Sequence, residues 1–187
     1  MARVNLKPST SLYPQPAVMV SCGDFDGRKN IITLAWVGVA CSEPPMVSIG
    51  VRPQRYSYEL IKANGEFVVN LSGPGLIRET DFCGNTSGRT VDKFKTLGLT
   101  PLRGAVVKAP VIAECLVNLE CRVRQVVQLG SHDLFVGEVV NVIADERALD
   151  ERGRIDLAKV NPLAYGAGDY WSLGQKIGVF GFTKSRA

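Results

Sequence analysis

The strongest constraint on the fold is a long stretch in which apolar and polar residues alternate. It is the segment "IAECLVNLECRVRQVVQLG", which begins at Ile112. Its apolar positions are Ala113, Cys115, Val117, Leu119, Cys121 and Val123, and its polar positions include Glu114, Asn118, Glu120, Arg122 and Arg124. A period of two predicts a β-strand with one buried face. A short "SHD" turn then leads into "LFVGEVVNVIADE", so the two runs predict a long antiparallel hairpin.

Other strand-like runs outnumber the helical ones. Strands are predicted in "PAVMVSCG" (16–23) and "EFVVNLS" (66–72), and "NIITLAWVGVACSEPPMVSIGV" (30–51) predicts two strands joined by a Ser-Glu-Pro-Pro corner. Helices are predicted for 55–65, with a stop at Asn-Gly, and for two short pieces within 73–98. In the second piece, Thr90 is the expected N-cap. The sequence therefore favours one domain over residues 1–187, a mainly β antiparallel barrel with short flanking helices.

Composition excludes several classes of protein. The 187 residues carry a net charge of +4, from 22 basic and 18 acidic side chains, and the basic residues are scattered rather than clustered as in nucleic-acid-binding proteins. No apolar stretch is long enough to predict a membrane span, and the N-terminal residues lack the apolar core of a signal peptide. We therefore expect a cytoplasmic protein without a membrane or nucleic-acid partner.

The cysteines and the histidine argue against a metal centre. The five cysteines, Cys22, Cys41, Cys83, Cys115 and Cys121, include no C-x-x-C pair, so buried reduced thiols are expected. His132 is the only histidine, and one histidine cannot build a histidine-rich zinc or iron site. The neighbouring residues of "SHD" are too close in sequence to form a catalytic triad. Any chemistry is therefore expected to depend on an organic cofactor.

Two segments carry polar residues suited to a phosphate, although neither contains a standard nucleotide-binding motif. Arg55 and Ser57 stand where the helix of 55–65 begins, and a helix N-terminus favours an anion. Ser87, Arg89 and Lys93 lie in "NTSGRTVDKF", which supplies further donors. The alternatives are that Ser57 only caps the helix beside a solvated Arg55, and that Lys93 lies on an exposed helix face.

Trp36 has two interpretations of the same kind. An aromatic residue within a strand commonly fills a core, but it also forms a wall for a flat ligand. His132 stands at a hairpin turn, where it is either an exposed turn residue or a catalytic one. Together with the phosphate-type donors, these residues suggest a flat, aromatic, phosphorylated ligand held by a barrel.

The segments together resemble the flavin reductase-like family, the FMN-binding split barrels, and within it the flavoredoxin-like branch. The resemblance extends over roughly 14–174 and is carried by "NIITLAWVGVACSEPPMVSIGV", "RYSYELI", "GEFVVNL", "DFCGNTSGRTVDKF", "SHDLFVGEV" and "PLAYGAGDYWSLG". It implies a six-stranded split barrel that forms a homodimer, with FMN near the subunit interface.

The resemblance also implies a role for ten residues. Asn30, Thr33, Trp36, Cys41 and Ser42 would lie along the isoalloxazine ring and the ribityl chain of FMN, Arg55, Ser57 and Lys93 would approach its phosphate, and His132 and Tyr165 would lie near the ring. Because Gln54 occupies a position where a second basic residue could assist the phosphate, the relative roles of Arg52 and Arg55 stay open.

The implied activity is electron transfer from NADH or NADPH to FMN. The flavin would carry the chemistry, so no side chain is expected to act as a nucleophile, and His132 is at most a modulator. One alternative is a flavoredoxin-type carrier that holds FMN tightly and exchanges electrons with a protein partner. A second alternative is a β-barrel with a purely structural role.

Overall fold

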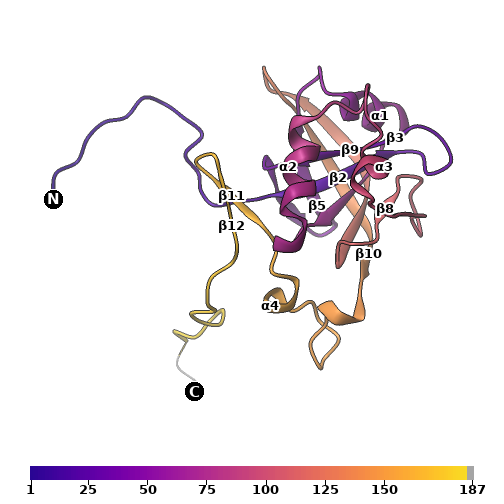
Figure 1. The fold of residues 1–187 in the computed structure, drawn as a ribbon. Coiled ribbons are helices and arrows are strands. Elements are labelled where there is room, and N and C mark those ends of the chain that lie inside the picture. The colour runs from indigo at the N-terminus through magenta and orange to yellow at the C-terminus, as the bar shows by residue number, and fades with distance from the viewer. Residues whose placement is uncertain (185–187) are drawn as a thin grey trace.

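The computed structural model describes residues 1–184, and its centre is one curved antiparallel sheet (Figure 1). The strands follow the order β3-β2-β6-β9-β10-β5-β4, and β3 also contacts β5, so the sheet curls on itself. The strands are β2 (Val18–Gly23), β3 (Lys29–Leu34), β4 (Val37–Ser42), β5 (Pro45–Val51), β6 (Glu66–Leu71), β9 (Val117–Gln128) and β10 (Asp133–Ala144). The predicted antiparallel barrel is therefore confirmed.

The long predicted hairpin is confirmed as β9 and β10. Their pairing runs from Asp133 opposite Gln128 to Ala144 opposite Val117, with register shifts after Val136 and after Val139. Gly137 directly follows the first shift, and a Cβ atom there would lie 2.6 Å from Cζ of Phe67. Only glycine lets β10 cross this aromatic ring closely.

The region 30–51 differs from the prediction, because it forms three strands instead of two. The chain leaves β3 at Ala35, where the amide of Val37 donates to the Ala35 carbonyl over 3.0 Å. The amide of Gly50 then donates to the Trp36 carbonyl over 2.7 Å, which starts the pairing of β4 with β5. This break gives the main sheet seven strands, where six were expected. The predicted corner is confirmed as the turn between β4 and β5.

The barrel interior is filled by side chains from opposite walls. Phe67 on β6 and Phe135 on β10 are both fully buried, and they pack with Val20 and Ile49 in one core cluster. Full burial of one such side chain contributes about 1.5–3 kcal/mol. The interior is therefore a packed core, and any ligand must bind outside it.

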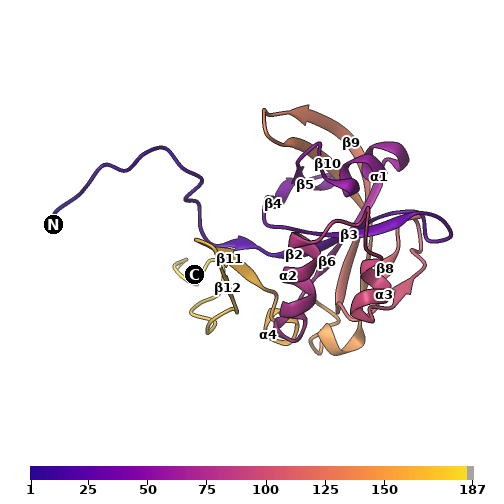
Figure 2. The ribbon, with the colours of Figure 1, turned by 45° about the horizontal axis from the view of Figure 1, so that its top comes forward.

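Short helices cover the β2–β3 side of the barrel (Figure 2). They are α1 (Tyr56–Asn64), η1 (Pro74–Leu76), α2 (Ile77–Asn85) and α3 (Lys93–Leu97), while η2 (Glu146–Ala148) and α4 (Leu157–Val160) follow β10. The predicted stop of α1 is confirmed, since Gly65 adopts a left-handed conformation with φ 68°. The predicted N-cap Thr90 is wrong: α3 begins after Asp92, whose carboxylate accepts from the Lys95 amide.

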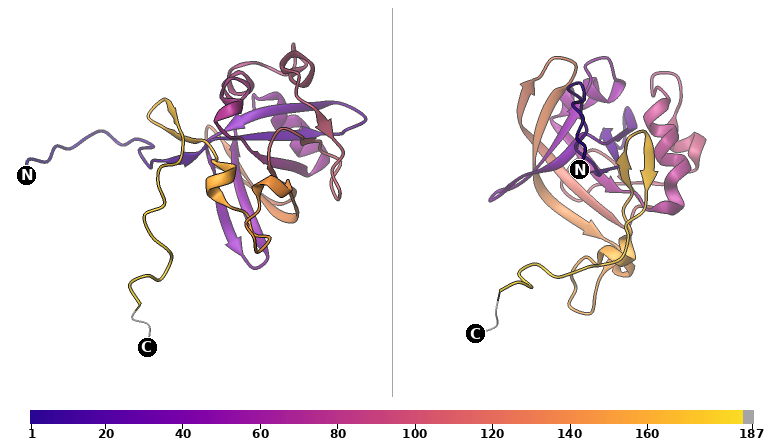
Figure 3. Two further views of the ribbon diagram at one scale, coloured as in Figure 1. Left: turned by 60° about the horizontal axis from the view of Figure 1, so that its bottom comes forward. Right: turned by 90° about the vertical axis from the view of Figure 1, so that its left-hand side faces the viewer.

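The C-terminal segment begins with regular structure. Strands β11 (Ala164–Gly166) and β12 (Asp169–Trp171) form a hairpin, and β1 (Gln15–Pro16) pairs with β11. From this small sheet the N-terminal residues and the residues after Trp171 run outward, on the same side of the barrel (Figure 3). A separate pair, β7 (Pro101–Leu102) and β8 (Val111–Ile112), lies near α3. Within residues 1–184, none of the helices has the length and apolar character needed to cross a membrane.

Candidate functional site

Two adjoining cavities lie between β3, the start of α1, the end of α2 and the C-terminal hairpin. The larger has a volume of about 400 Å³ and the smaller about 80 Å³. Ile32, Arg55 and Gly84 line both. Because the two cavities share these lining residues, they adjoin and make up one candidate site with a wide and a narrow part.

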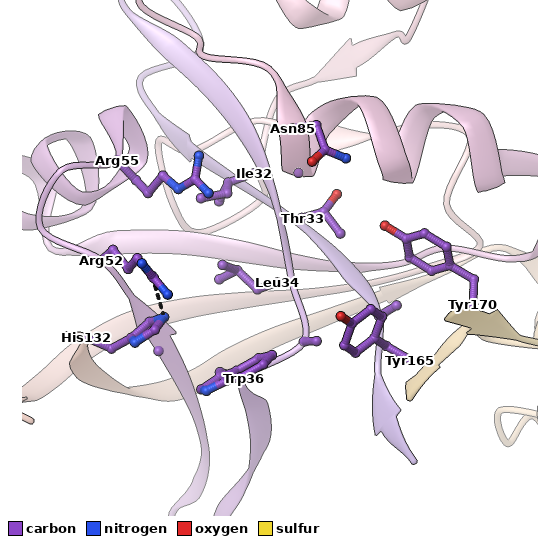
Figure 4. A pocket seen from close by; sticks show the side chains of 14 residues that line it. Ile32, Thr33, Leu34, Trp36, Arg52, Arg55, Asn85, His132, Tyr165 and Tyr170 are labelled. Carbon is purple, nitrogen blue, oxygen red and sulfur yellow. Dashed lines mark hydrogen bonds between the residues drawn. The ribbon is translucent and has the colours of Figure 1, made fainter. Parts of the chain in front are cut away.

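Aromatic side chains wall the wide cavity at two ends (Figure 4). At one end the rings of Trp36 and His132 are stacked, with 6.0 Å between their centroids and 9° between their planes. At the other end Tyr165 and Tyr170 meet edge to face at 5.9 Å. Such walls suit a flat ligand with a π-system.

His132 is held on both of its ring nitrogens. The Arg52 guanidinium donates from Nε to Nε2 of His132 over 3.4 Å, and Nδ1 lies 2.9 Å from the Ser131 hydroxyl. A nitrogen that accepts from arginine carries no proton, so this arrangement requires a neutral imidazole. Desolvation, followed by the positive charges of Arg52 and Arg55, lowers the pKa of His132 below its ordinary value of 6.5.

Polar groups line the narrow cavity at the start of α1. Ser57 is fully buried, and its hydroxyl accepts a hydrogen bond from the Asn30 side-chain amide over 2.9 Å. The sequence alternative in which Ser57 caps the helix is wrong, because α1 has Arg55 at its N-cap and no side-chain cap. Gly88 lies directly against Asn30: a Cβ atom there would be 2.0 Å from Oδ1 of Asn30. The loop before α3, which contains Gly88, therefore forms one wall of the narrow cavity.

Lys93 brings a buried positive charge to the narrow cavity. The side chain is 3% exposed, so the alternative of an exposed helix face is wrong. Its Nζ donates to the carbonyl oxygens of Ile31, at 2.7 Å, and of Cys83, at 2.8 Å. Desolvation lowers the pKa of Lys93. Because an ammonium has three hydrogens, one donor remains for a ligand in the cavity.

The charge of the site is positive throughout. Arg52, Arg55 and Lys93 are the lining residues with a full charge, and neither cavity is lined by an Asp or a Glu. Among residues 1–184, none of these three cations forms an ion pair. The donor set therefore suits an anionic ligand.

The structure brings together eight of the ten predicted site residues. They are Asn30, Thr33, Trp36, Arg55, Ser57, Lys93, His132 and Tyr165, each of which lines one or both cavities. Cys41 and Ser42 lie on β4 and line neither; the Cys41 thiol donates to the Glu43 carbonyl over 3.3 Å. The roles of these two residues stay predictions.

Among the polar and aromatic residues that line the wide cavity, Asn85 and Tyr170 were not predicted from the sequence. A signal for Tyr170 was present, because "AYGAGDYW" places two aromatic residues symmetrically about a glycine-rich turn. The hairpin pairs Tyr165 with Tyr170 directly. Asn85 has no such signal, since its place depends on where α2 ends.

Four of the five cysteines are buried, as predicted, whereas Cys41 is half-buried on the edge strand. All five are free thiols. Burial raises the pKa of Cys22, Cys115 and Cys121 to about 12 and that of Cys83 to about 11. These four groups are therefore protonated and poorly nucleophilic at neutral pH.

Comparison with known proteins identifies the class that this fold and site define. The family model "Flavin reductase like domain" matches residues 10–174, so the chain belongs to the flavin reductase-like family. The predicted split-barrel fold class is thereby confirmed, apart from the strand count.

Three solved structures show the relationship in detail. The flavoredoxin of Desulfovibrio vulgaris (Miyazaki F) is 32% identical with a TM-score of 0.92, covering 97% of this chain and 99% of the other. The flavoredoxin of Methanosarcina acetivorans is 32% identical with a TM-score of 0.91, covering 99% and 98%. An FMN-binding protein of Thermus thermophilus is 26% identical with a TM-score of 0.79, covering 96% and 97%.

Proposed function

We propose that the chain binds FMN across the two cavities and accepts electrons for it from NADH or NADPH. The observation that carries this proposal is that an aromatic-walled cavity adjoins a narrow, cationic one. A flavin mononucleotide has the same division, with a flat ring system at one end and a phosphate at the other.

The residues present fit such a ligand. The narrow cavity offers Arg55, the buried ammonium of Lys93 and the N-terminus of α1, which together suit a phosphate dianion. The wide cavity offers the Trp36–His132 wall on one side and Tyr165 on the other. Thr33 lines the wide cavity and Asn30 the narrow one, both from β3, and their polar side chains suit a hydroxylated linker.

The chain's own residues bind and orient, because bound FMN itself supplies the hydride and electron chemistry. Trp36 and His132 form one wall of the wide cavity, where they would orient the flat ring of the ligand. His132 is held neutral, so it accepts from Arg52 instead of adding a positive charge. No side chain is required to act as a nucleophile, and His132 remains a modulator.

A flavoredoxin-type electron carrier is the second candidate function. It is supported by the 32% identity to two flavoredoxins over nearly the whole chain. It is also supported by the exposure of Trp36, which is 42% accessible at the wall of the cavity. In this function a redox protein would be the electron partner.

Titration of the apo-protein with FMN, followed by anaerobic addition of NADH and of NADPH, tests both functions. Saturable FMN binding with rapid bleaching of the flavin absorbance by either nucleotide is the result expected for the first. Tight FMN binding with slow bleaching would favour the carrier. Absence of saturable FMN binding would refute both and favour a structural barrel.

We further propose a homodimer, and this proposal is independent of the redox partner. Apolar side chains in the two outward-running segments are highly exposed, among them Leu6 at 83%, Ile177 at 100% and Phe180 at 104%. Exposed apolar groups of this kind support contact with a second copy. Light scattering during gel filtration would test it, and a monomer at micromolar concentration would refute it. The cytoplasmic location also stays a prediction.

A further inference from the structure

The site holds more positive charge than one phosphate requires. A phosphate monoester carries close to two negative charges at neutral pH. Lys93 and Arg55 line the narrow cavity, and together they offset that charge. Arg52 remains as a third cation, and it lines the wide cavity only.

Arg52 and Arg55 lie in the same turn but do not line the same set of cavities. They flank Pro53 and Gln54 in the turn after β5, in which the amide of Arg55 donates to the carbonyl of Arg52 over 3.0 Å. Arg55 touches both cavities, whereas Arg52 reaches toward the Trp36–His132 wall (Figure 4). The sequence left their relative roles open, and this placement separates them.

The Arg52 guanidinium is oriented yet keeps most of its donors. Its Nε donates a hydrogen bond to Nε2 of His132 over 3.4 Å, and neither of its terminal nitrogens has a hydrogen-bond partner within residues 1–184. Two free terminal nitrogens in one plane match a pair of phosphate oxygens. The Arg52 side chain is exposed, so a ligand from solvent reaches it directly.

We propose that Arg52 binds the diphosphate of a dinucleotide electron donor that shares the wide cavity with the flavin. Arg52 then determines specificity for that donor and is dispensable for holding the flavin phosphate. This inference rests on the proposed function, because it assigns the narrow cavity to the phosphate of FMN.

The test uses ADP-ribose, which carries the diphosphate but no nicotinamide, so that binding is measured without electron transfer. His132 is the only histidine, so the spectrum contains one histidine Hε1 proton signal, and it comes from the imidazole beside Arg52. ADP-ribose is titrated into the FMN-loaded protein while this signal is followed. Adenosine, which lacks phosphate, serves as the comparison ligand.

The variants are Arg52→Gln, Arg55→Gln and Arg147→Gln. The last removes an exposed arginine that pairs with Asp145 and lines neither cavity. For Arg52→Gln we expect ADP-ribose affinity to fall about 10- to 100-fold, as loss of charge-assisted hydrogen bonds predicts, with FMN affinity within about twofold of wild type. Arg55→Gln should show weakened FMN binding, and Arg147→Gln should change neither. Arg52→Lys, which keeps the charge, should recover part of the ADP-ribose affinity.

The remaining outcomes overturn either the inference alone or the proposed function together with it. Equal ADP-ribose affinity in wild type and Arg52→Gln, or no ADP-ribose binding to FMN-loaded wild type, overturns the inference alone. Loss of FMN affinity in Arg52→Gln equal to that in Arg55→Gln assigns Arg52 to the flavin phosphate and also overturns it. Failure of wild type to bind FMN at all overturns the proposed function first, and the inference with it.

Discussion

The ammonium of Lys93, on α3, donates a hydrogen bond to the main-chain carbonyl of Ile31, on β3, over 2.7 Å. A second hydrogen bond, to the Cys83 carbonyl, connects the same nitrogen to α2. The buried Lys93 side chain thus connects α2 and α3 to β3, the strand that lines the site. Lys93 is therefore both a structural link and a candidate phosphate ligand.

Loss of Lys93 should affect stability and FMN binding together. In Lys93→Met two carbonyl oxygens lose their donor, so the free energy of unfolding should fall by about 1–3 kcal/mol. The double variant Arg55→Ala, Lys93→Ala should also weaken FMN binding by about 1.5–3 kcal/mol for each cation. Urea unfolding and flavin fluorescence titration measure the two effects.

Lys95→Met is the matched control for Lys93→Met, since Lys95 is an exposed residue of the same helix. It should change neither quantity by more than about 0.5 kcal/mol. Unchanged FMN affinity in the double variant would mean that the phosphate binds elsewhere.

Trp36 should report flavin binding directly. The chain has two tryptophans, so Trp171→Phe leaves Trp36 as the only indole. Because Trp36 lines the wide cavity, its fluorescence should be strongly quenched as FMN saturates the site. Trp36→Ala should weaken FMN binding by about 1–3 kcal/mol, as for the loss of a stacked aromatic group.

The reciprocal variant, Trp36→Phe with Trp171 retained, is the control for this experiment. The fluorescence of Trp171 should respond less to FMN, because this residue lines neither cavity. Equal quenching of both indoles at saturation would contradict the proposal that the flavin ring lies against the Trp36–His132 wall.

His132 should make the folded state less stable in mild acid. Its pKa in the folded protein lies below the ordinary value of 6.5, so the unfolded chain binds a proton more readily. The stability is therefore complete above pH 6.5 and decreases as the pH falls through 6.5 toward the folded-state pKa. His132→Gln should lose this part of the pH dependence.

Chemical denaturation of both proteins between pH 8 and pH 5 measures the difference. In addition, the Hε1 proton NMR signal of His132 should titrate below 6.5 in wild type, and closer to 6.5 in Arg52→Gln, which lacks one of the neighbouring charges. A wild-type titration at or above 6.5 would refute the neutral, arginine-bonded imidazole.

Gly137 should not tolerate a side chain. In Gly137→Ala the new methyl group would lie 2.6 Å from Cζ and 2.8 Å from Cε1 of Phe67, in the packed core. Overpacking of this kind costs about 1–3 kcal/mol. The thermal unfolding midpoint should therefore fall, and Phe67→Leu in the same chain should recover part of the loss.

Gly38→Ala is the matched control, because Gly38 also lies in a strand but has no atom within 4 Å of an added Cβ. Its midpoint should stay close to that of wild type. A similar loss in both variants would indicate a general cost of replacing a strand glycine instead of a clash with Phe67.

Local sequence patterns predicted much of the fold, because each of them depends only on residues that are close in sequence. The alternation over 113–124 depends only on the period of a strand, and it correctly gave the β9–β10 hairpin. The Asn-Gly pair at the end of α1 acted through the left-handed conformation of Gly65. The break after Ala35 was missed because no proline or glycine marks it there. It depends on the pairing of Trp36 with Gly50 across the sheet.

The features of the site also fall into two groups, those predicted from the sequence and those decided by tertiary contacts. The sequence by itself determined the antiparallel barrel, the absence of a histidine-rich metal site and the presence of phosphate-type donors at two helix starts. Only the tertiary structure decided that Lys93 is buried in the wall of the narrow cavity, that Tyr170 joins Tyr165, and that Arg55 lines both cavities whereas Arg52 lines the wide one alone. The physical reason is that alternation, caps and turns act between neighbouring residues. The surroundings of a side chain, by contrast, are set by strands and helices that are distant in sequence.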